Sequence, residues 1–183
     1  MKEKNNVVAK AIIVVAITVL MMIAGFITFN IVFIKDANKN IIKSFQKKAE
    51  TIVSKYPYVG VIHIDKINIE YPILEDSSEE AMKTSVVKLF GANPDEIGNL
   101  CIMGNNTKNN LFFSNLVKLE SGDEISIKNK ENKEVKYAVY DMYTTSLTDS
   151  EFLSQKTGDK REVTLVTETT KEDKRIIVKA REI

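Results

Sequence analysis

Two short stretches of sequence decide the fold of this chain: Gly98-Asn99-Leu100-Cys101-Ile102-Met103-Gly104-Asn105 and Val163-Thr164-Leu165-Val166-Thr167-Glu168. Each contains a short apolar run, a pattern typical of a buried strand. A third run of this kind begins at Arg175. The two quoted stretches end in the polar residues Asn105 and Glu168, and the interpretation of function depends on these two positions.

Alternating and β-branched patterns predict further strands around these stretches. The strands expected are residues 59–67, 69–74, 100–103, 124–128, 135–145, 162–167 and 175–180. Asp76 or Ser77 is expected to cap a helix that runs to about residue 90. A helical turn is expected within residues 111–119. Many short strands with few short helices predict a mainly-β protein, a closed β-barrel of about seven or eight strands.

The N-terminal part of the chain has a different pattern. Residues 11–34 are almost continuously apolar and contain no charged side chain. As a helix they would be about 36 Å long, enough to cross a hydrocarbon core of about 30 Å. We predict a transmembrane anchor here, in contact with the lipid bilayer, rather than a cleaved signal or a buried core helix. Residues 1–10 would precede it, 35–56 would form an amphipathic stalk helix or linker, and 57–183 the barrel domain.

Six segments within residues 59–183 resemble, in order, those of the sortases, the membrane-anchored cysteine transpeptidases of Gram-positive bacteria. The segments are residues 60–67, 71–75, 98–105, 112–123, 164–168 and 175–178. In that family the third segment ends in Gly-His and the fifth ends in Thr-Cys, whereas this chain has Asn105 and Glu168. Arg175 matches the family's arginine. The N-terminal anchor and compact length are more similar to class A or D than to class B.

The activity that this resemblance implies needs a thiolate, a histidine that carries a proton, and an arginine or backbone donors for the oxyanion. Asn105 exchanges no proton near neutral pH and offers only hydrogen bonds. Glu168 places a carboxylate where the sulfur would be. We expect Glu168 and Arg175 to form a hydrogen-bonded ion pair that occupies the oxyanion donor. All three residues are therefore candidates for binding a peptide rather than for catalysis.

The sequence offers no good replacement for the missing nucleophile and base. Cys101 lies inside an apolar strand and is interpreted as a small buried hydrophobe. His63, on the opening strand, is interpreted as a surface or structural histidine. Thr167 and Glu168 are neighbours in a strand, so their side chains point to opposite faces.

The orientation in the membrane rests on two opposed indications. Lysines both precede and follow the anchor: Lys2, Lys4 and Lys10 before it, and Lys35, Lys39, Lys43, Lys47 and Lys48 after it. The positive-inside rule thus favours a cytoplasmic C-terminal domain. The resemblance implies the opposite, and we expect a single-pass membrane protein with a cytoplasmic N-terminus and an extracellular barrel.

Composition excludes several other classes of function. The 26 basic and 25 acidic residues give a net charge of +1, so no global field draws in nucleic acid. One cysteine excludes an intrachain disulfide and a multi-cysteine metal site. Four clustered acids are interpreted as helix-capping and solvated: Glu75, Asp76, Glu79 and Glu80. We predict no metal and no cofactor.

Three functions remain open at this point. The first is a sortase-like pseudoenzyme at the bacterial cell surface, which binds a sorting-signal-like peptide or a surface or pilin protein without cleaving it. The second is an active sortase-type transpeptidase or peptidase with an atypical site. The third is a structural or regulatory scaffold of the cell envelope. Because function must be argued from the site, the changes at Asn105 and Glu168 favour the first.

Overall fold

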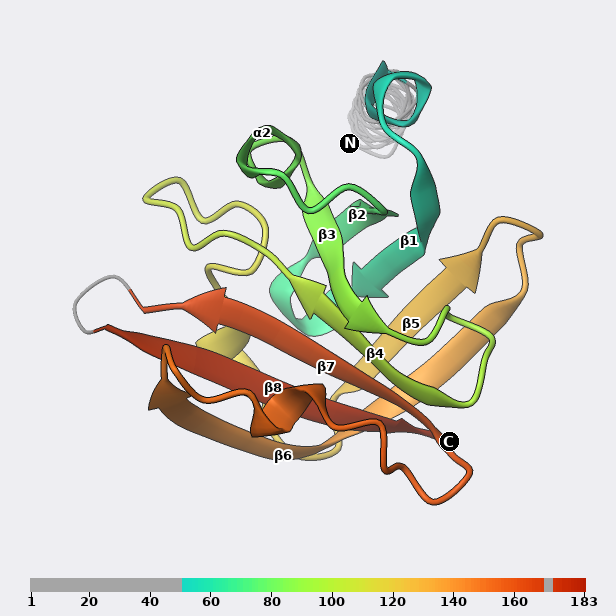
Figure 1. Ribbon diagram of the computed structural model, residues 1–183, viewed down its shortest axis with the longest axis vertical. Coiled ribbons are helices and arrows are strands. Elements are labelled where there is room, and N and C mark those ends of the chain that lie inside the picture. The colour runs from blue at the N-terminus through green and yellow to red at the C-terminus, as the bar shows by residue number, and fades with distance from the viewer. Residues whose placement is uncertain (1–50, 170–172) are drawn as a thin grey trace, which may run out of the picture. The chain divides into compact units, whose positions relative to one another are not determined.

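Eight strands of the described residues close into a β-barrel in the order β1-β2-β3-β4-β7-β8-β6-β5 (Figure 1). The computed structural model describes residues 51–169 and 173–183. The strands are β1 (Tyr58–Ile64), β2 (Ile69–Leu74), β3 (Val86–Gly91), β4 (Gly98–Met103), β5 (Glu124–Asn129), β6 (Glu134–Ser146), β7 (Arg161–Glu168) and β8 (Lys174–Glu182). The pairs β2–β3 and β4–β7 are parallel. The predicted fold, a mainly-β closed barrel, is confirmed.

The helix predicted from Asp76 or Ser77 to about residue 90 is wrong. The α-helix α2 covers only Glu79–Met82, and its cap is Ser78, whose Oγ accepts a hydrogen bond from the Ala81 N–H at 3.3 Å. Strand β3 begins at Val86, after residues 83–85. Its first residues, Val86 and Val87, are fully buried, and β-branched side chains favour a strand that packs in this way.

The remaining helical elements with defined bounds are three short 3-10 helices: η1 (Asp65–Ile67), η2 (Leu116–Lys118) and η3 (Glu151–Leu153). The second of these is the helical turn expected within residues 111–119.

Strand β7 is buried on both of its faces. Val163 and Leu165 belong to the central core inside the barrel. Val166 packs on the other side, in a smaller cluster with Phe152 of η3 and Ile177 of β8. A strand covered on both faces has a continuous apolar run instead of an alternating one. This explains why β7 is recognisable in the sequence.

Little of the predicted N-terminal organisation falls within the described part of the chain. The predicted segments 1–10 and 11–34, and residues 35–50 of the stalk, lie outside it. Residues 51–55 are helical, and Ile52 packs in a small cluster with Leu74 and Val87. Within residues 51–169 and 173–183 there is no helix of the length and apolarity that crossing a membrane requires.

A buried asparagine fixes the β6–β7 connection, residues 147–160, to the barrel. The Asn99 side chain is fully buried, and its Nδ2 donates to the carbonyl oxygens of Phe152 at 2.9 Å and Ser154 at 3.1 Å. Its Oδ1 accepts from the Thr164 hydroxyl at 2.8 Å. The Gln155 side chain bonds both backbone groups of Asn99. Asn99 of β4 therefore holds the β6–β7 connection, which lies beside neighbouring ends of β7 and β8, against the barrel.

We expect Asn99→Ala to lower the free energy of unfolding by about 2–4 kcal/mol, because it leaves buried carbonyl groups and a hydroxyl without partners. Urea denaturation followed by tyrosine fluorescence measures the change. The control is Glu70→Ala, at an exposed position of β2, which should change stability by no more than about 0.5 kcal/mol. A loss below about 1 kcal/mol for Asn99→Ala would contradict the assigned anchoring role.

Candidate functional site

The parallel pairing of β4 with β7 brings the two quoted stretches side by side. Pairing runs to Met103 opposite Val166, and the Gly104 N–H then donates to the Val166 carbonyl oxygen at 3.0 Å. The Thr167 hydroxyl donates to the Gly104 carbonyl oxygen at 2.7 Å. A Cβ at Gly104 would lie 2.8 Å from the Phe113 ring. Only glycine therefore allows the chain to leave β4 along this path.

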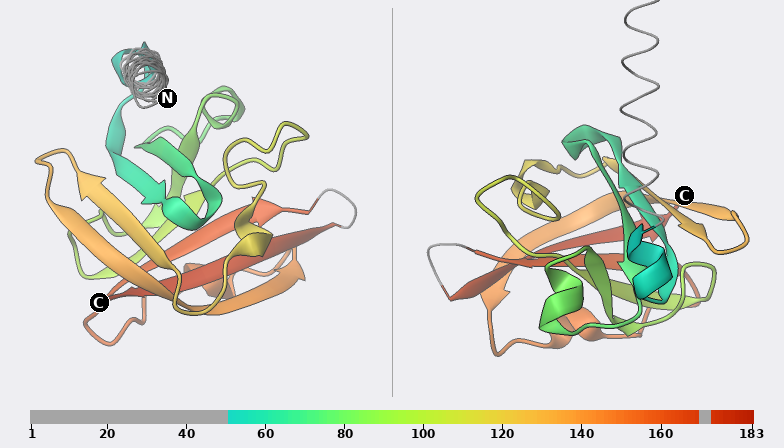
Figure 2. Two further views of the ribbon diagram at one scale, coloured as in Figure 1. Left: turned by 180° about the vertical axis from the view of Figure 1, so that it is seen from behind. Right: turned by 90° about the horizontal axis from the view of Figure 1, so that it is seen from above.

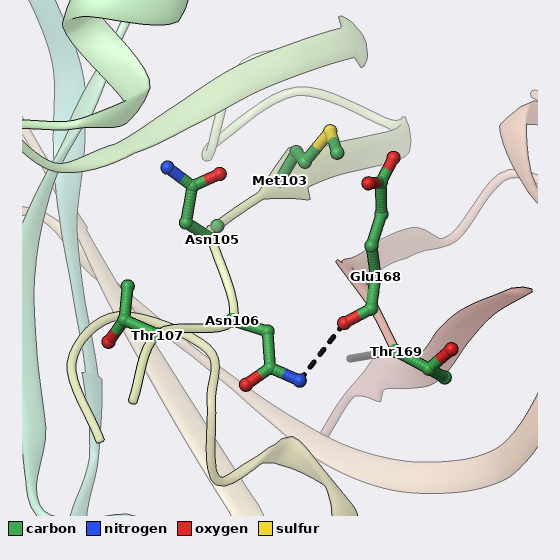
Figure 3. Close-up of a pocket in the computed structure, with 7 residues that line it drawn as sticks. Met103, Asn105, Asn106, Thr107, Glu168 and Thr169 are labelled. Carbon is green, nitrogen blue, oxygen red and sulfur yellow. Dashed lines mark hydrogen bonds between the residues drawn. The ribbon is translucent and has the colours of Figure 1, made fainter. Parts of the chain in front are cut away.

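A pocket of about 270 Å³ opens where the two strands end (Figure 3). Its described lining residues are Met103, Gly104, Asn105, Asn106, Thr107, Glu168 and Thr169. Figures 1 and 2 show that the segment after β4 lies on the same side of the barrel as the neighbouring ends of β7 and β8. Two of the three predicted site residues, Asn105 and Glu168, thus share one cavity.

The other side chains that line the pocket were not predicted from the sequence to bind a ligand. Asn106 directly follows Asn105, and Thr107 is the next residue after it. Thr169 directly follows Glu168. Adjacency to Asn105 and Glu168 was the only signal in the sequence that could have identified them.

Both asparagine amides are fixed by backbone carbonyl groups. Asn105 Nδ2 donates to the Met82 carbonyl oxygen, at the end of α2, over 3.0 Å. Asn106 Nδ2 donates to the Glu168 carbonyl oxygen, also over 3.0 Å, and so ties the segment after β4 to the end of β7 (Figure 3). Neither amide ionises near neutral pH, so neither can act as an acid or a base.

Glu168 and Arg175 are direct cross-strand partners in β7 and β8. Arg175 Nη2 lies 3.8 Å from Glu168 Oε1, so the expected ion pair is present. The expected hydrogen bond within that pair is wrong, because 3.8 Å exceeds hydrogen-bond distance. The Glu168 side chain is 51% exposed, which leaves its carboxylate accessible to a ligand.

Arg175 contacts the β6–β7 connection and is not among the residues that line the pocket. Its Nη1 donates to the Leu147 carbonyl oxygen at 3.0 Å, and its guanidinium carbon lies 6.0 Å from the centre of the Phe152 ring. Its Nε is buried and has no hydrogen-bond partner among the described residues. The guanidinium is therefore engaged by the loop, and its binding role stays a prediction.

The single thiol is not available for catalysis. Cys101 is fully buried, and its Sγ lies 3.8 Å from the Phe152 carbonyl oxygen and 3.9 Å from that of Asn99. Burial raises the pKa of the Cys101 thiol to about 12. A thiol with this pKa stays neutral at physiological pH, and the neutral thiol is not the nucleophile. The interpretation of Cys101 as a buried hydrophobe is confirmed.

The single histidine lies on a different part of the barrel. His63 is on β1, which pairs with β2 and β5 and not with the strands that form the pocket. Its Nε2 lies 2.9 Å from Asp65 Oδ1, and its side chain is 44% exposed. The pocket therefore contains neither imidazole nor thiol among its described residues. Within those residues there is also no group of three or more His, Cys, Asp or Glu side chains that could hold a metal ion.

The described residues thus form a closed β-barrel in which the parallel strands β4 and β7 end at a pocket lined by Asn105 and Glu168. The chain belongs to the sortase family: the Sortase domain model matches residues 62–183. Sortase A of Bacillus anthracis is 27% identical over 133 residues, which cover 72% of this chain and 62% of the relative. This chain thus spans about three fifths of the length of that relative.

Solved structures similar to the barrel include those of two further sortases. The Clostridium perfringens Sortase D5 transpeptidase is 32% identical, with a TM-score of 0.62 over 75% of this chain and 88% of that one. Streptococcus pneumoniae Sortase C, whose structure bears on catalysis and pilin substrate specificity, is 23% identical, with a TM-score of 0.63 over 69% and 66% of the two chains. The expected similarity to class A and D sortases is confirmed.

Cys101 should react with iodoacetamide only when the chain unfolds. At pH 9 a thiol with a pKa of about 12 is almost entirely neutral, whereas an exposed thiol with an ordinary pKa of about 8.5 is mostly thiolate. We expect alkylation of the folded chain to be at least about a hundredfold slower than in 6 M guanidinium chloride. Mass spectrometry at timed intervals measures both rates. Equal rates would show that the thiol is accessible and would reopen it as a nucleophile.

Proposed function

We propose that this sortase-family chain is a non-catalytic module that binds a peptide segment of a surface or pilin protein in the pocket at the ends of β4 and β7. One observation carries the proposal. The chain has one cysteine and one histidine, and the first is buried in the barrel wall while the second is on β1. Cysteine transpeptidation needs both groups at the scissile bond.

Glu168 is a poor substitute for the missing thiol. A carboxylate that attacked a peptide carbonyl carbon would be a better leaving group than an unprotonated amine, so the tetrahedral adduct would return to the peptide. Protonating the amine requires an acid, and Asn105 cannot supply a proton. Arg175, which resembles the family's oxyanion donor, already donates to the Leu147 carbonyl oxygen. These points favour binding without bond cleavage over an active peptidase.

The peptide ligand follows from the family and from the pocket. The Clostridium perfringens relative is a transpeptidase, an enzyme class that acts on peptides, and this chain keeps the corresponding barrel. The pocket supplies amide, hydroxyl and carboxylate groups, which suit hydrogen bonds to an extended peptide. A scaffold that contacts partners only through its stalk would not need such a pocket.

The proposed location is the outer face of the cell membrane. Residues 11–34 would anchor the chain, and residues 57–183 would lie outside, as the family resemblance implies. The lysines between residues 35 and 48 oppose this orientation under the positive-inside rule. Protease added to intact cells should degrade an outward-facing barrel, whereas protection of the barrel would place it in the cytoplasm.

The direct test compares the native chain with Asn105→His/Glu168→Cys. Each full-length protein, in a neutral detergent, is mixed with sorting-signal peptides and an amine acceptor, and the products are measured by mass spectrometry. We expect the native chain to bind a peptide with no product above the protein-free rate, and the double variant to form product. The two single variants are the matched controls, because each lacks one of the required groups. Product formation by the native chain that is lost in Glu168→Gln would contradict the proposal.

A further inference from the structure

One wall of the pocket is held in place by a neighbouring segment of the same loop. Residues 105–107 follow the end of β4 and line the cavity (Figure 3), and residues 112–114 run back along them. Three contacts join the two segments: the Phe113 N–H to the Asn105 carbonyl oxygen at 3.3 Å, an antiparallel bridge of Asn106 with Phe112, and the Thr107 N–H to Ser114 Oγ at 2.7 Å. The position of the wall therefore depends on the path of residues 112–114.

That path requires an unusual backbone conformation at Phe112. Its φ is 53°, in the left-handed region that bulky side chains rarely adopt, because the Cβ crowds the backbone there. A strained conformation of this kind persists only where the surrounding structure holds it. Asn110 is also left-handed, with a φ of 56°, but asparagine tolerates this region. Phe112 is therefore the strained position of the loop.

Tyr71 of β2 supplies contacts that hold Phe112 in this conformation. The Tyr71 hydroxyl oxygen accepts a hydrogen bond from the Phe112 N–H at 3.2 Å, and the two ring centroids lie 5.3 Å apart. Phe112 is buried in the central core, and a buried backbone N–H needs an acceptor. Tyr71 itself is fixed by the pairing of β2 with β1, in which it lies opposite Ile62. A barrel strand thus sets the path of the loop.

We propose that Tyr71 is a positioning residue of the pocket, which acts through Phe112 on the wall formed by residues 105–107. Tyr71 is not among the residues that line the cavity, so its effect on a ligand is indirect. A wall that is already in place binds more tightly than one that must be ordered by the ligand, because less conformational entropy is lost on binding. The effect on peptide binding rests on the proposed function, whereas the effect on the wall does not.

Hydrogen exchange in the variant Tyr71→Phe tests the wall directly, because this change removes the hydroxyl and keeps the ring. The full-length chain is held in a neutral detergent, and exchange of its backbone amides is followed by NMR. We expect the Thr107 and Phe113 amides to exchange at least about tenfold faster, since both lose their acceptors when the loop moves. The Gly104 amide, which donates to the Val166 carbonyl oxygen, should keep its native rate. Equal acceleration at Gly104 would show a general loss of stability and would overturn the positioning role.

Two further variants assign the effect to this chain of contacts. Tyr137→Phe is the matched control, because the Tyr137 hydroxyl also bonds a loop backbone, at the Pro94 carbonyl oxygen over 2.9 Å, and neither residue lines the pocket. It should leave exchange at Thr107 unchanged. Ser114→Ala removes the acceptor of the Thr107 N–H and should reproduce the faster exchange there. A native exchange rate at Thr107 in Tyr71→Phe would overturn the inference.

Peptide binding separates this inference from the proposed function. For a peptide that the native chain binds, Tyr71→Phe should weaken binding by about three- to tenfold, and Tyr137→Phe should leave it unchanged. Faster exchange at Thr107 with unchanged peptide affinity would keep the binding function and overturn the role of Tyr71 in it. If the native chain binds no peptide, the proposed function fails, and the exchange rate at Thr107 still decides whether Tyr71 positions the wall.

Discussion

Strands β4 and β7 run parallel and end side by side, and the site depends on this constraint. The pairing holds from Gly98 opposite Arg161 to Met103 opposite Val166, and the Gly104–Val166 and Thr167–Gly104 hydrogen bonds extend it to the pocket. Backbone pairing and buried apolar side chains supply this geometry. The side-chain groups of Asn105 and Glu168 make none of these hydrogen bonds. The barrel can therefore keep its shape while the groups at Asn105 and Glu168 change.

Those changed groups alter what the pocket can do. A thiol and an imidazole exchange protons and form covalent bonds near neutral pH, whereas two amides and a carboxylate form hydrogen bonds and carry a fixed negative charge. Arg175 donates a hydrogen bond to the Leu147 carbonyl oxygen, and its guanidinium lies over the Phe152 ring. It therefore stabilises a loop beside the pocket. The Cys101 side chain is fully buried and is not among the described residues that line the pocket. These features are consistent with a family member that holds a peptide and releases it unchanged.

The parts of the fold that were predictable are those with a local pattern. The buried run of β7 and the alternation of β6 are visible in the sequence, and the resemblance to the sortases implied that Glu168 lies beside Arg175. Strand β3 was missed because an acidic, well-capped start favours a helix locally, while its pairing with β2 and β4 is a tertiary effect. Phe112 has a φ of 53° and bonds the Tyr71 hydroxyl, 41 residues away, so the path after Asn105 was not predictable. The anchor and stalk at residues 11–50 remain predictions.

The central claim is that the pocket holds a peptide without forming a covalent bond to it. The most direct measurement is a crystal structure of the chain after long incubation with a peptide ligand. The account predicts an intact peptide backbone at the ends of β4 and β7, in non-covalent contact with Asn105, Asn106 and Glu168. Continuous electron density from a side chain of the pocket to a peptide carbonyl carbon, or a cleaved peptide in the pocket, would contradict it.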